Sequence, residues 1–126
     1  MIRISDQRIV RGETHRLRLT VRDQDRQPVD LTGATIYARV RAVVPGYPVS
    51  YVAPAIQLVS PTGIEIAAQT GDTLGQATIT FAPADTGALS PGEYAWDAWV
   101  VTAGGDRHAV VAPSRFTVID RVTAIT

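Results

Sequence analysis

Apolar side chains occupy every second position in several short stretches of this chain, and this spacing limits the folds open to it. Leu17, Leu19 and Val21 alternate with polar residues, and residues 76–82 repeat the pattern. A period of two places the apolar side chains on one face of a β-strand, whereas a helix needs a period of about 3.6 residues. No long stretch has a helical period, so the sequence predicts an all-β protein.

Eight prolines and ten glycines separate the apolar stretches. These residues end strands and form turns. The sequence therefore predicts about seven to nine short strands in a two-sheet antiparallel β-sandwich, with residues 83–92 crossing between the sheets. We expect tight hairpin turns at residues 60–63 and 103–107. The expected strands are residues 14–22, 34–44, 55–59, 64–67, 76–82, 94–102, 108–112 and 115–120.

The whole chain, residues 1–126, is expected to form one domain, because a chain of this length buries one good core but not two. There is no cysteine, which excludes a disulfide scaffold and a thiol nucleophile. No apolar run reaches the ~18 residues of a membrane helix. Charges interrupt the apolar stretches at the N-terminus, so we expect neither a signal peptide nor a membrane partner.

All twelve basic residues are arginine, and they are unevenly distributed. Residues 1–41 contain nine arginines and five acidic residues, whereas residues 42–126 contain three and seven. The net charge of zero argues against a nucleic-acid partner. The uneven distribution predicts a dipolar molecule whose positive face meets the negative face of another copy. If the first two strands are neighbours, their arginines share one face, which we expect to be a protein interface formed by Arg16, Arg18, Arg39 and Arg41.

A proline-rich loop is predicted at residues 45–54, since its three prolines exclude a central strand. Tyr47 and Tyr51 lie in this loop. Exposed apolar surface marks interaction sites, and tyrosine is enriched among the residues that dominate binding energy. We therefore expect the loop to contact other proteins.

The segment around Tyr94 is typical of immunoglobulin-like sandwiches, in which a tyrosine near the start of a late strand donates its hydroxyl to an upstream backbone group. Trp96 follows two residues later, where antibodies have a buried cysteine, and we interpret both side chains as structural core. Strand alternation places Trp99 on the outer face, beside Asp97. Trp99 is therefore expected at a protein interface.

Side chains that could perform catalysis are scattered along the chain. His15 and His108 have no ligand-like spacing around them, and the acidic residues lie mostly at turns. The serines lack the sequence context of a nucleophile elbow. We therefore expect no catalytic residue, metal site or cofactor, and the chain is not expected to be an enzyme.

Three segments in succession resemble immunoglobulin-like domains of tailed-bacteriophage virion proteins, especially the N-terminal domain of baseplate upper proteins. They are residues 11–14, residues 28–36, and residues 89–97 followed by 116–118 and 122–123. The resemblance implies a non-enzymatic virion component that docks other proteins. A baseplate upper protein continues into a long C-terminal region after this domain, whereas this sequence ends after the expected sandwich, so we expect an isolated module.

Two function hypotheses follow. The first is a structural protein of a phage or prophage particle: a tail or baseplate adaptor, a fibre anchor, or a capsid decoration or cement protein. It would be assembled in the host cytoplasm, reside in the virion, form homo-oligomers and dock capsid, neck or baseplate proteins. The alternative is a carbohydrate-binding β-sandwich in which Tyr47, Tyr51 and Trp99 stack on sugar rings.

Overall fold

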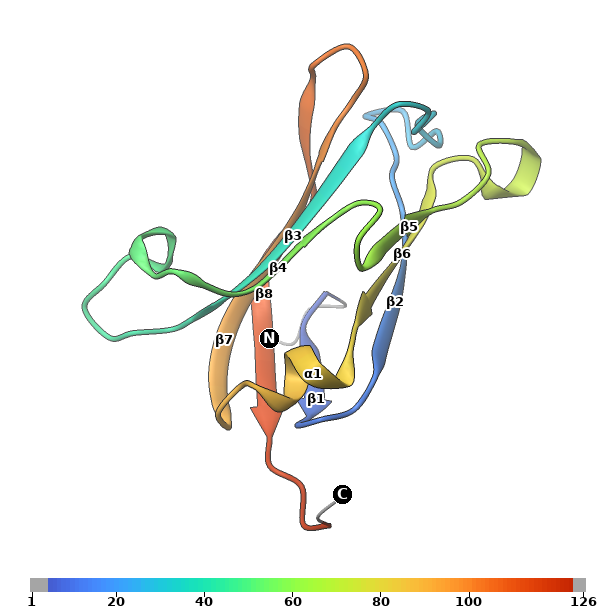
Figure 1. Ribbon diagram of the computed structural model, residues 1–126. Helices are drawn as coiled ribbons and strands as arrows, with labels where there is room; N and C mark the ends of the chain where they lie inside the picture. The colour runs from blue at the N-terminus through green and yellow to red at the C-terminus, as the bar shows by residue number, and fades with distance from the viewer. Residues whose placement is uncertain (1–4, 124–126) are drawn as a thin grey trace.

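The computed structural model describes residues 5–123 and places eight strands in two packed sheets (Figure 1). The five-stranded sheet has the order β1-β8-β7-β3-β4, and the three-stranded sheet has the order β2-β6-β5. The all-β, immunoglobulin-like sandwich is confirmed. One pairing departs from the antiparallel prediction, because β1 and β8 run parallel. The strands are β1 Gln7–Val10, β2 His15–Thr20, β3 Thr35–Ala42, β4 Pro54–Val59, β5 Ile64–Ile66, β6 Gln76–Phe81, β7 Gly92–Val101 and β8 Arg107–Ile119.

The core lies between the sheets, and three aromatic rings span it. Phe81 comes from the three-stranded sheet, while Trp96 and Phe116 come from the five-stranded sheet. Phe81 meets both other rings edge-on, with centroids 6.2 Å from Trp96 and 5.2 Å from Phe116. The indole Nε1 of Trp96 donates a hydrogen bond of 2.8 Å to the carbonyl oxygen of Ser5. Trp96, at 2% exposure, is therefore a core residue with its polar atom satisfied.

The long predicted strands have the expected faces. Ile36, Ala38 and Val40 are buried in β3, and the inward positions of β6 and β7 alternate in the same way. The hairpin through residues 103–107 is also confirmed. Two details differ: β1 was not predicted, and the two strands expected at 108–112 and 115–120 form a single strand, β8.

The predicted hairpin between β4 and β5 is wrong, although the turn between them exists. Val59 and Thr62 form one bridge, with the Thr62 amide donating to the Val59 carbonyl at 2.8 Å. The chain then leaves this edge, and β5 pairs with β6 in the other sheet. The turn at residues 60–63 is therefore a crossing between sheets, because pairing with β6 buries Ile64 in the shared core.

A shared face for the arginines of β2 and β3 required these strands to be neighbours, and they are not. β2 pairs with β6 in one sheet, whereas β3 pairs with β4 and β7 in the other. The outer faces of two packed sheets point in opposite directions. Arg16 and Arg18 therefore lie on one side of the molecule, and Arg39 and Arg41 lie on the other.

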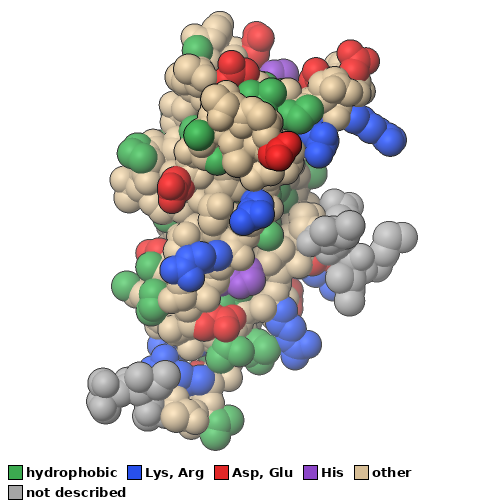
Figure 2. Space-filling view, turned by 90° about the vertical axis from the view of Figure 1, so that its right-hand side faces the viewer, with side chains coloured by type: hydrophobic (Ala, Val, Ile, Leu, Met, Phe, Trp, Pro, Cys, Tyr) green, Lys and Arg blue, Asp and Glu red, His purple; other side chains and the backbone are tan. Residues whose placement is uncertain are grey.

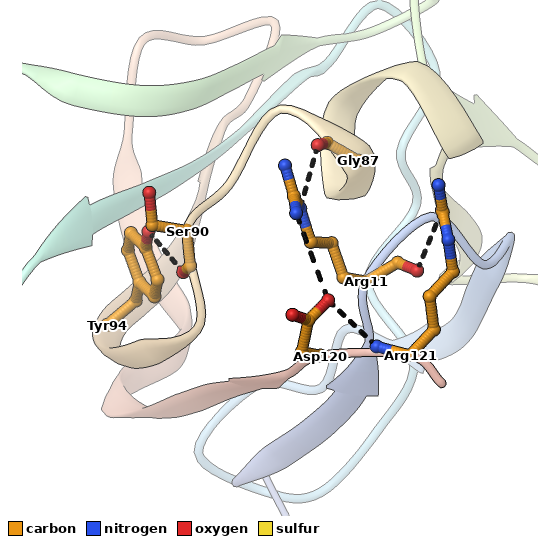
Figure 3. Close-up of polar contacts among 6 residues, drawn as sticks. All are labelled: Arg11, Gly87, Ser90, Tyr94, Asp120 and Arg121. Carbon is orange, nitrogen blue, oxygen red and sulfur yellow. Dashed lines mark hydrogen bonds and ion pairs between the residues drawn. The ribbon is translucent and has the colours of Figure 1, made fainter. Parts of the chain in front are cut away.

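The crossing from β6 to β7, predicted at residues 83–92, contains one helical turn, α1 Pro83–Gly87. Downstream of it, the Tyr94 hydroxyl donates to the carbonyl oxygen of Ser90 at 2.9 Å, which confirms the tyrosine corner (Figure 3). In residues 5–123 no helix has the length and apolar character needed to cross a membrane.

Arg11 bonds to two other segments at the end of the sandwich that carries α1 (Figure 3). Its Nε donates to the carbonyl oxygen of Gly87 at 3.1 Å, and its Nη1 lies 3.8 Å from the carboxylate of Asp120. The Arg11 amide also donates to the carbonyl oxygen of Ile119 at 2.8 Å. The turn after β1 is thus joined both to the α1 crossing and to the end of β8.

Asp30 closes the turn that leads into β3. The Thr32 hydroxyl and the Thr32 amide both donate to its carboxylate, at 2.7 and 2.9 Å. These two bonds, the hydroxyl one first, hold the pKa of Asp30 below its ordinary value. Gly33 follows with a φ of +73°, a conformation that glycine adopts readily. The segment 28–36 is thus a structural turn entering a strand.

Candidate interaction surface

The outer face of the five-stranded sheet holds a group of four side chains from β3 and β7. Tyr37 lies directly opposite Trp99 in the ladder, and Arg39 lies directly opposite Asp97. Directly opposite residues in adjacent strands have their Cβ atoms about 4.5–5.5 Å apart. Trp99 is 42% exposed, while its neighbours in β7, Ala98 and Val100, are buried. We call Tyr37, Arg39, Asp97 and Trp99 the Trp99 face.

Two contacts orient the aromatic rings of the Trp99 face. The indole Nε1 of Trp99 donates to Oδ2 of Asp97 at 3.2 Å, which fixes one edge of the ring. The guanidinium carbon of Arg39 lies 5.7 Å from the ring centroid of Tyr37, within the range of a cation–π contact. The face is therefore organised by its own side chains.

Open grooves flank Trp99 on both sides. One, of about 280 Å³, lies between Trp99 and residues Val49 and Ser50. The other, of about 450 Å³, extends from Trp99 toward Val101 and Arg107. Arg39, Asp97 and Trp99 line both grooves, and Trp99 also borders a third hollow beside His108 and Ala109. The Trp99 face is therefore a ridge among open hollows rather than a single cavity.

The second candidate surface is the segment 43–53 between β3 and β4, which we call the arm. It projects away from the sandwich (Figure 1). Tyr47 is 66% exposed and Tyr51 is 81% exposed, and Val43 and Val44 are exposed as well. The arm contains one short 3₁₀ turn, Val49–Tyr51, which has no buried residue. The predicted proline-rich loop is therefore present, with both tyrosines directed to solvent.

Arg41 anchors the arm to the sheet. Its Nη1 donates to the carbonyl oxygens of Val52 at 2.6 Å and Ser50 at 3.3 Å. These bonds occupy the guanidinium group inside the subunit. Arg41 was expected to contact other proteins, and the structure places it as a support for the arm.

Arg16 and Arg18 lie apart from both surfaces. They are exposed on the outer face of β2 in the three-stranded sheet. Figure 2, which views the side that carries β2, β5 and β6, shows basic and acidic side chains interspersed. The expected arginine interface is thus divided between opposite sides of the molecule.

The two halves of the sequence, which differ in net charge, are interleaved in the sheets. β3 lies between β7 and β4, β1 lies beside β8, and β2 lies beside β6. Strands from the positive and negative halves are therefore neighbours in both sheets, and Arg39 lies opposite Asp97. The division of charge along the sequence is therefore not a division between the two sheets.

Neither histidine belongs to a cluster that could hold a metal. His15 is hydrogen-bonded to Gln7 at 2.7 Å and stacks on Phe81 with a centroid distance of 6.3 Å. Within residues 5–123 no group of three or more His, Asp or Glu side chains could bind a metal ion. His15 is a packing residue of β2.

Sequence reasoning missed Tyr37 as a member of the candidate surface. Its outward direction was evident from the alternation in residues 34–44, but its partner was not. The signal lies in the register, which sets Tyr37 opposite Trp99 across two strands far apart in the sequence. Only the pairing of β3 with β7 combines the two rings into one surface.

No protein-family model matches the chain, and a search of curated proteins finds no similar one. Among solved structures, the chain is similar to AggA, the major subunit of aggregative adherence fimbriae type I from Escherichia coli. The sequence identity is 17% and the TM-score is 0.31, over 90% of this chain and 89% of AggA. A similarity of this size carries no argument about function, so the assignment of the fold depends on the strand order described above.

Proposed function

We propose that this chain is a non-enzymatic structural component of a phage or prophage particle that docks other particle proteins through its arm and associates with itself. The observation that carries the proposal is the exposure of the arm. Four of the large apolar side chains that the structure leaves exposed lie within this one segment: Val43, Val44, Tyr47 and Tyr51. A contiguous group of this kind on a folded domain marks an interaction site.

The way the arm is held supports a docking role. The bonds from Arg41 to the carbonyl oxygens of Ser50 and Val52 fix the part of the arm that leads back to the sheet. Less conformational freedom is therefore lost when a partner binds. Tyr47 and Tyr51 provide large contact area for few rotatable bonds. A projecting, anchored loop with two aromatic side chains fits a pocket or groove on a larger protein.

The phage assignment is supported by the order of the three resembling segments. The fold explains each one locally: residues 11–14 form the turn into β2, residues 28–36 the turn into β3, and residues 89–97 the tyrosine corner. Turns of this kind recur widely, so their succession along one chain is what supports the assignment. The roles that we propose within the particle are a tail or baseplate adaptor, a fibre anchor, or a capsid decoration or cement protein.

The test is mass spectrometry of purified particles, together with re-binding of recombinant protein to particles that lack it. We expect the chain in the particles and an oligomer or co-assembly by light scattering at micromolar concentration. The double variant Tyr47→Ser, Tyr51→Ser should lose re-binding, whereas the matched exposed variant Trp99→Ala should keep it. A strictly monomeric protein that is absent from particles would overturn the proposal.

A further inference from the structure

Trp99 lies outside the arm, and its surroundings have a chemistry of their own. The two grooves beside it are lined by planar polar side chains of both signs, with Arg39 and Asp97 in both, Arg41 in one and Arg107 in the other. Arg39 also lies 3.5 Å from Oε1 of Gln57 through its Nε. A surface that pairs guanidinium, carboxylate and amide groups with two aromatic rings offers donors and acceptors together.

This mixture favours one kind of ligand. A cationic polymer would be repelled by the three arginines of the grooves, and an acidic polymer that crosses Trp99 would meet the carboxylate of Asp97, which accepts the bond from Trp99 and lines both grooves. A purely apolar partner would leave both charged groups desolvated without compensation. A neutral molecule with many hydroxyl groups satisfies both, because each hydroxyl donates to a carboxylate and accepts from a guanidinium.

The rings supply the second part of the recognition. Trp99 presents an exposed ring whose orientation is fixed by the bond from Nε1 to Asp97. The C–H groups of a sugar ring form an apolar face that packs on such a ring. Because grooves lie on both sides of Trp99, the surface accommodates a chain that crosses the ring rather than one small molecule in a closed pocket.

We propose that the Trp99 face binds a neutral oligosaccharide, with one sugar ring stacked on Trp99, Arg39 and Asp97 bonded to its hydroxyls, and neighbouring sugars in the two grooves. Tyr47 and Tyr51, which the sequence also suggested for sugar binding, lie on the arm and are not part of this site. The proposal goes beyond docking through the arm and does not depend on it. A particle protein with both surfaces would be held by the arm and would contact glycans through the sheet.

The test uses tryptophan fluorescence, since the chain has two tryptophans and Trp96 is 2% exposed. Changes on titration therefore report on Trp99. The probes are cellohexaose, maltohexaose, chitohexaose and mannohexaose, with hexagalacturonate as the acidic comparison and polyglutamate as the peptide comparison. We expect saturable binding of at least one neutral hexasaccharide and weaker binding of both acidic probes.

Variants separate the roles of the residues. Binding measured by calorimetry should weaken at least about tenfold in Trp99→Ala, a loss of about 1.4 kcal/mol or more. Trp99→Phe, which keeps an aromatic ring, should retain most of the affinity. Asp97→Asn should weaken binding without loss of the fold, as followed by circular dichroism. The arm variant Tyr51→Ala is the matched control and should bind sugar unchanged.

Several results would overturn the proposal. The absence of binding by every neutral hexasaccharide at millimolar concentration would do so. Binding of hexagalacturonate or polyglutamate that is tighter than binding of the neutral hexasaccharides would also do so. Equal affinity of Trp99→Ala and the unmodified protein would place the sugar elsewhere. Because Tyr51→Ala tests the arm separately, loss of sugar binding and loss of particle docking are distinguishable.

Discussion

Tyr94 stands where the chain enters the five-stranded sheet from the α1 crossing, and its hydroxyl group joins two segments that lie four residues apart. The donor is largely buried, at 8% exposure, and its acceptor is the carbonyl oxygen of Ser90. A buried hydroxyl that loses its partner is costly, while removal of the hydroxyl alone costs only the net value of one bond. The residue therefore makes a small, measurable contribution.

Tyr94→Phe should lower the free energy of unfolding by about 1 kcal/mol, the net value of one hydrogen bond. Chemical denaturation followed by fluorescence measures the change. Tyr51→Phe is the matched control, since the Tyr51 side chain is 81% exposed, and it should leave the midpoint unaltered. A Tyr94→Phe protein as stable as the control would show that the corner bond contributes nothing to folding.

Gly75 shows how a single backbone position can constrain a turn. Its φ is +79°, and a Cβ added there would lie 2.9 Å from the carbonyl oxygen of Val21. Gly75→Ala should lower the free energy of unfolding by roughly 2–3 kcal/mol, through left-handed backbone strain and this contact. Gly46 also has a positive φ, +83°, but nothing lies within 4 Å of an added Cβ. Thermal unfolding should therefore show a smaller loss for Gly46→Ala, and equal losses would contradict the contact.

At the scale of the element, local patterns predicted the strands but not their partners. β3, β6 and β7 follow from alternation within a few residues, and the tyrosine corner follows from a short spacing. β1 has only four residues, too few for a period, and it is held by parallel pairing with β8 more than a hundred residues later. β5 pairs with β6 rather than β4 because burial of Ile64 depends on the whole sandwich.

The candidate surfaces were likewise only partly predictable from the sequence. The prolines of the loop predicted the exposure of Tyr47 and Tyr51, and strand alternation predicted that of Trp99. The role of Arg41 could not be inferred, since its acceptors are backbone carbonyls of the arm. The separation of Arg16 from Arg39 could not be inferred either, because it depends on β2 and β3 belonging to different sheets.

The arm is the element whose order depends most directly on one side chain. Arg41→Ala removes both bonds to the carbonyls of Ser50 and Val52, so the arm should open locally while the sandwich stays folded. Chymotrypsin should then cleave after Tyr51 several times faster, whereas Tyr47 is followed by proline and resists cleavage. Arg39→Ala, on the same sheet face, is the control. An unchanged cleavage rate would mean that Arg41 does not hold the arm.

On the scale of the whole molecule, the sandwich places its core residues and the proposed binding residues on different faces of the same strands. β7 buries Trp96 against the other sheet and exposes Trp99 on the outer side, three residues later. The ring of Trp96 touches Phe81 of the opposite sheet, so it joins the two layers. Trp99 donates a hydrogen bond to Asp97 of its own strand and lies opposite Tyr37 in the ladder of its own sheet. Substitutions at these two positions should therefore have separable effects.

Trp96→Ala should lower the free energy of unfolding by about 3–5 kcal/mol, because it removes a large core side chain and leaves a cavity. Trp99→Ala should lower it by no more than about 1 kcal/mol, since part of that ring is already in water. Differential scanning calorimetry of both variants measures the two losses, and sugar titration measures binding by the folded fraction. Equal losses of stability would show that Trp99 is a core residue, and the division of β7 into an inner folding face and an outer binding face would fail.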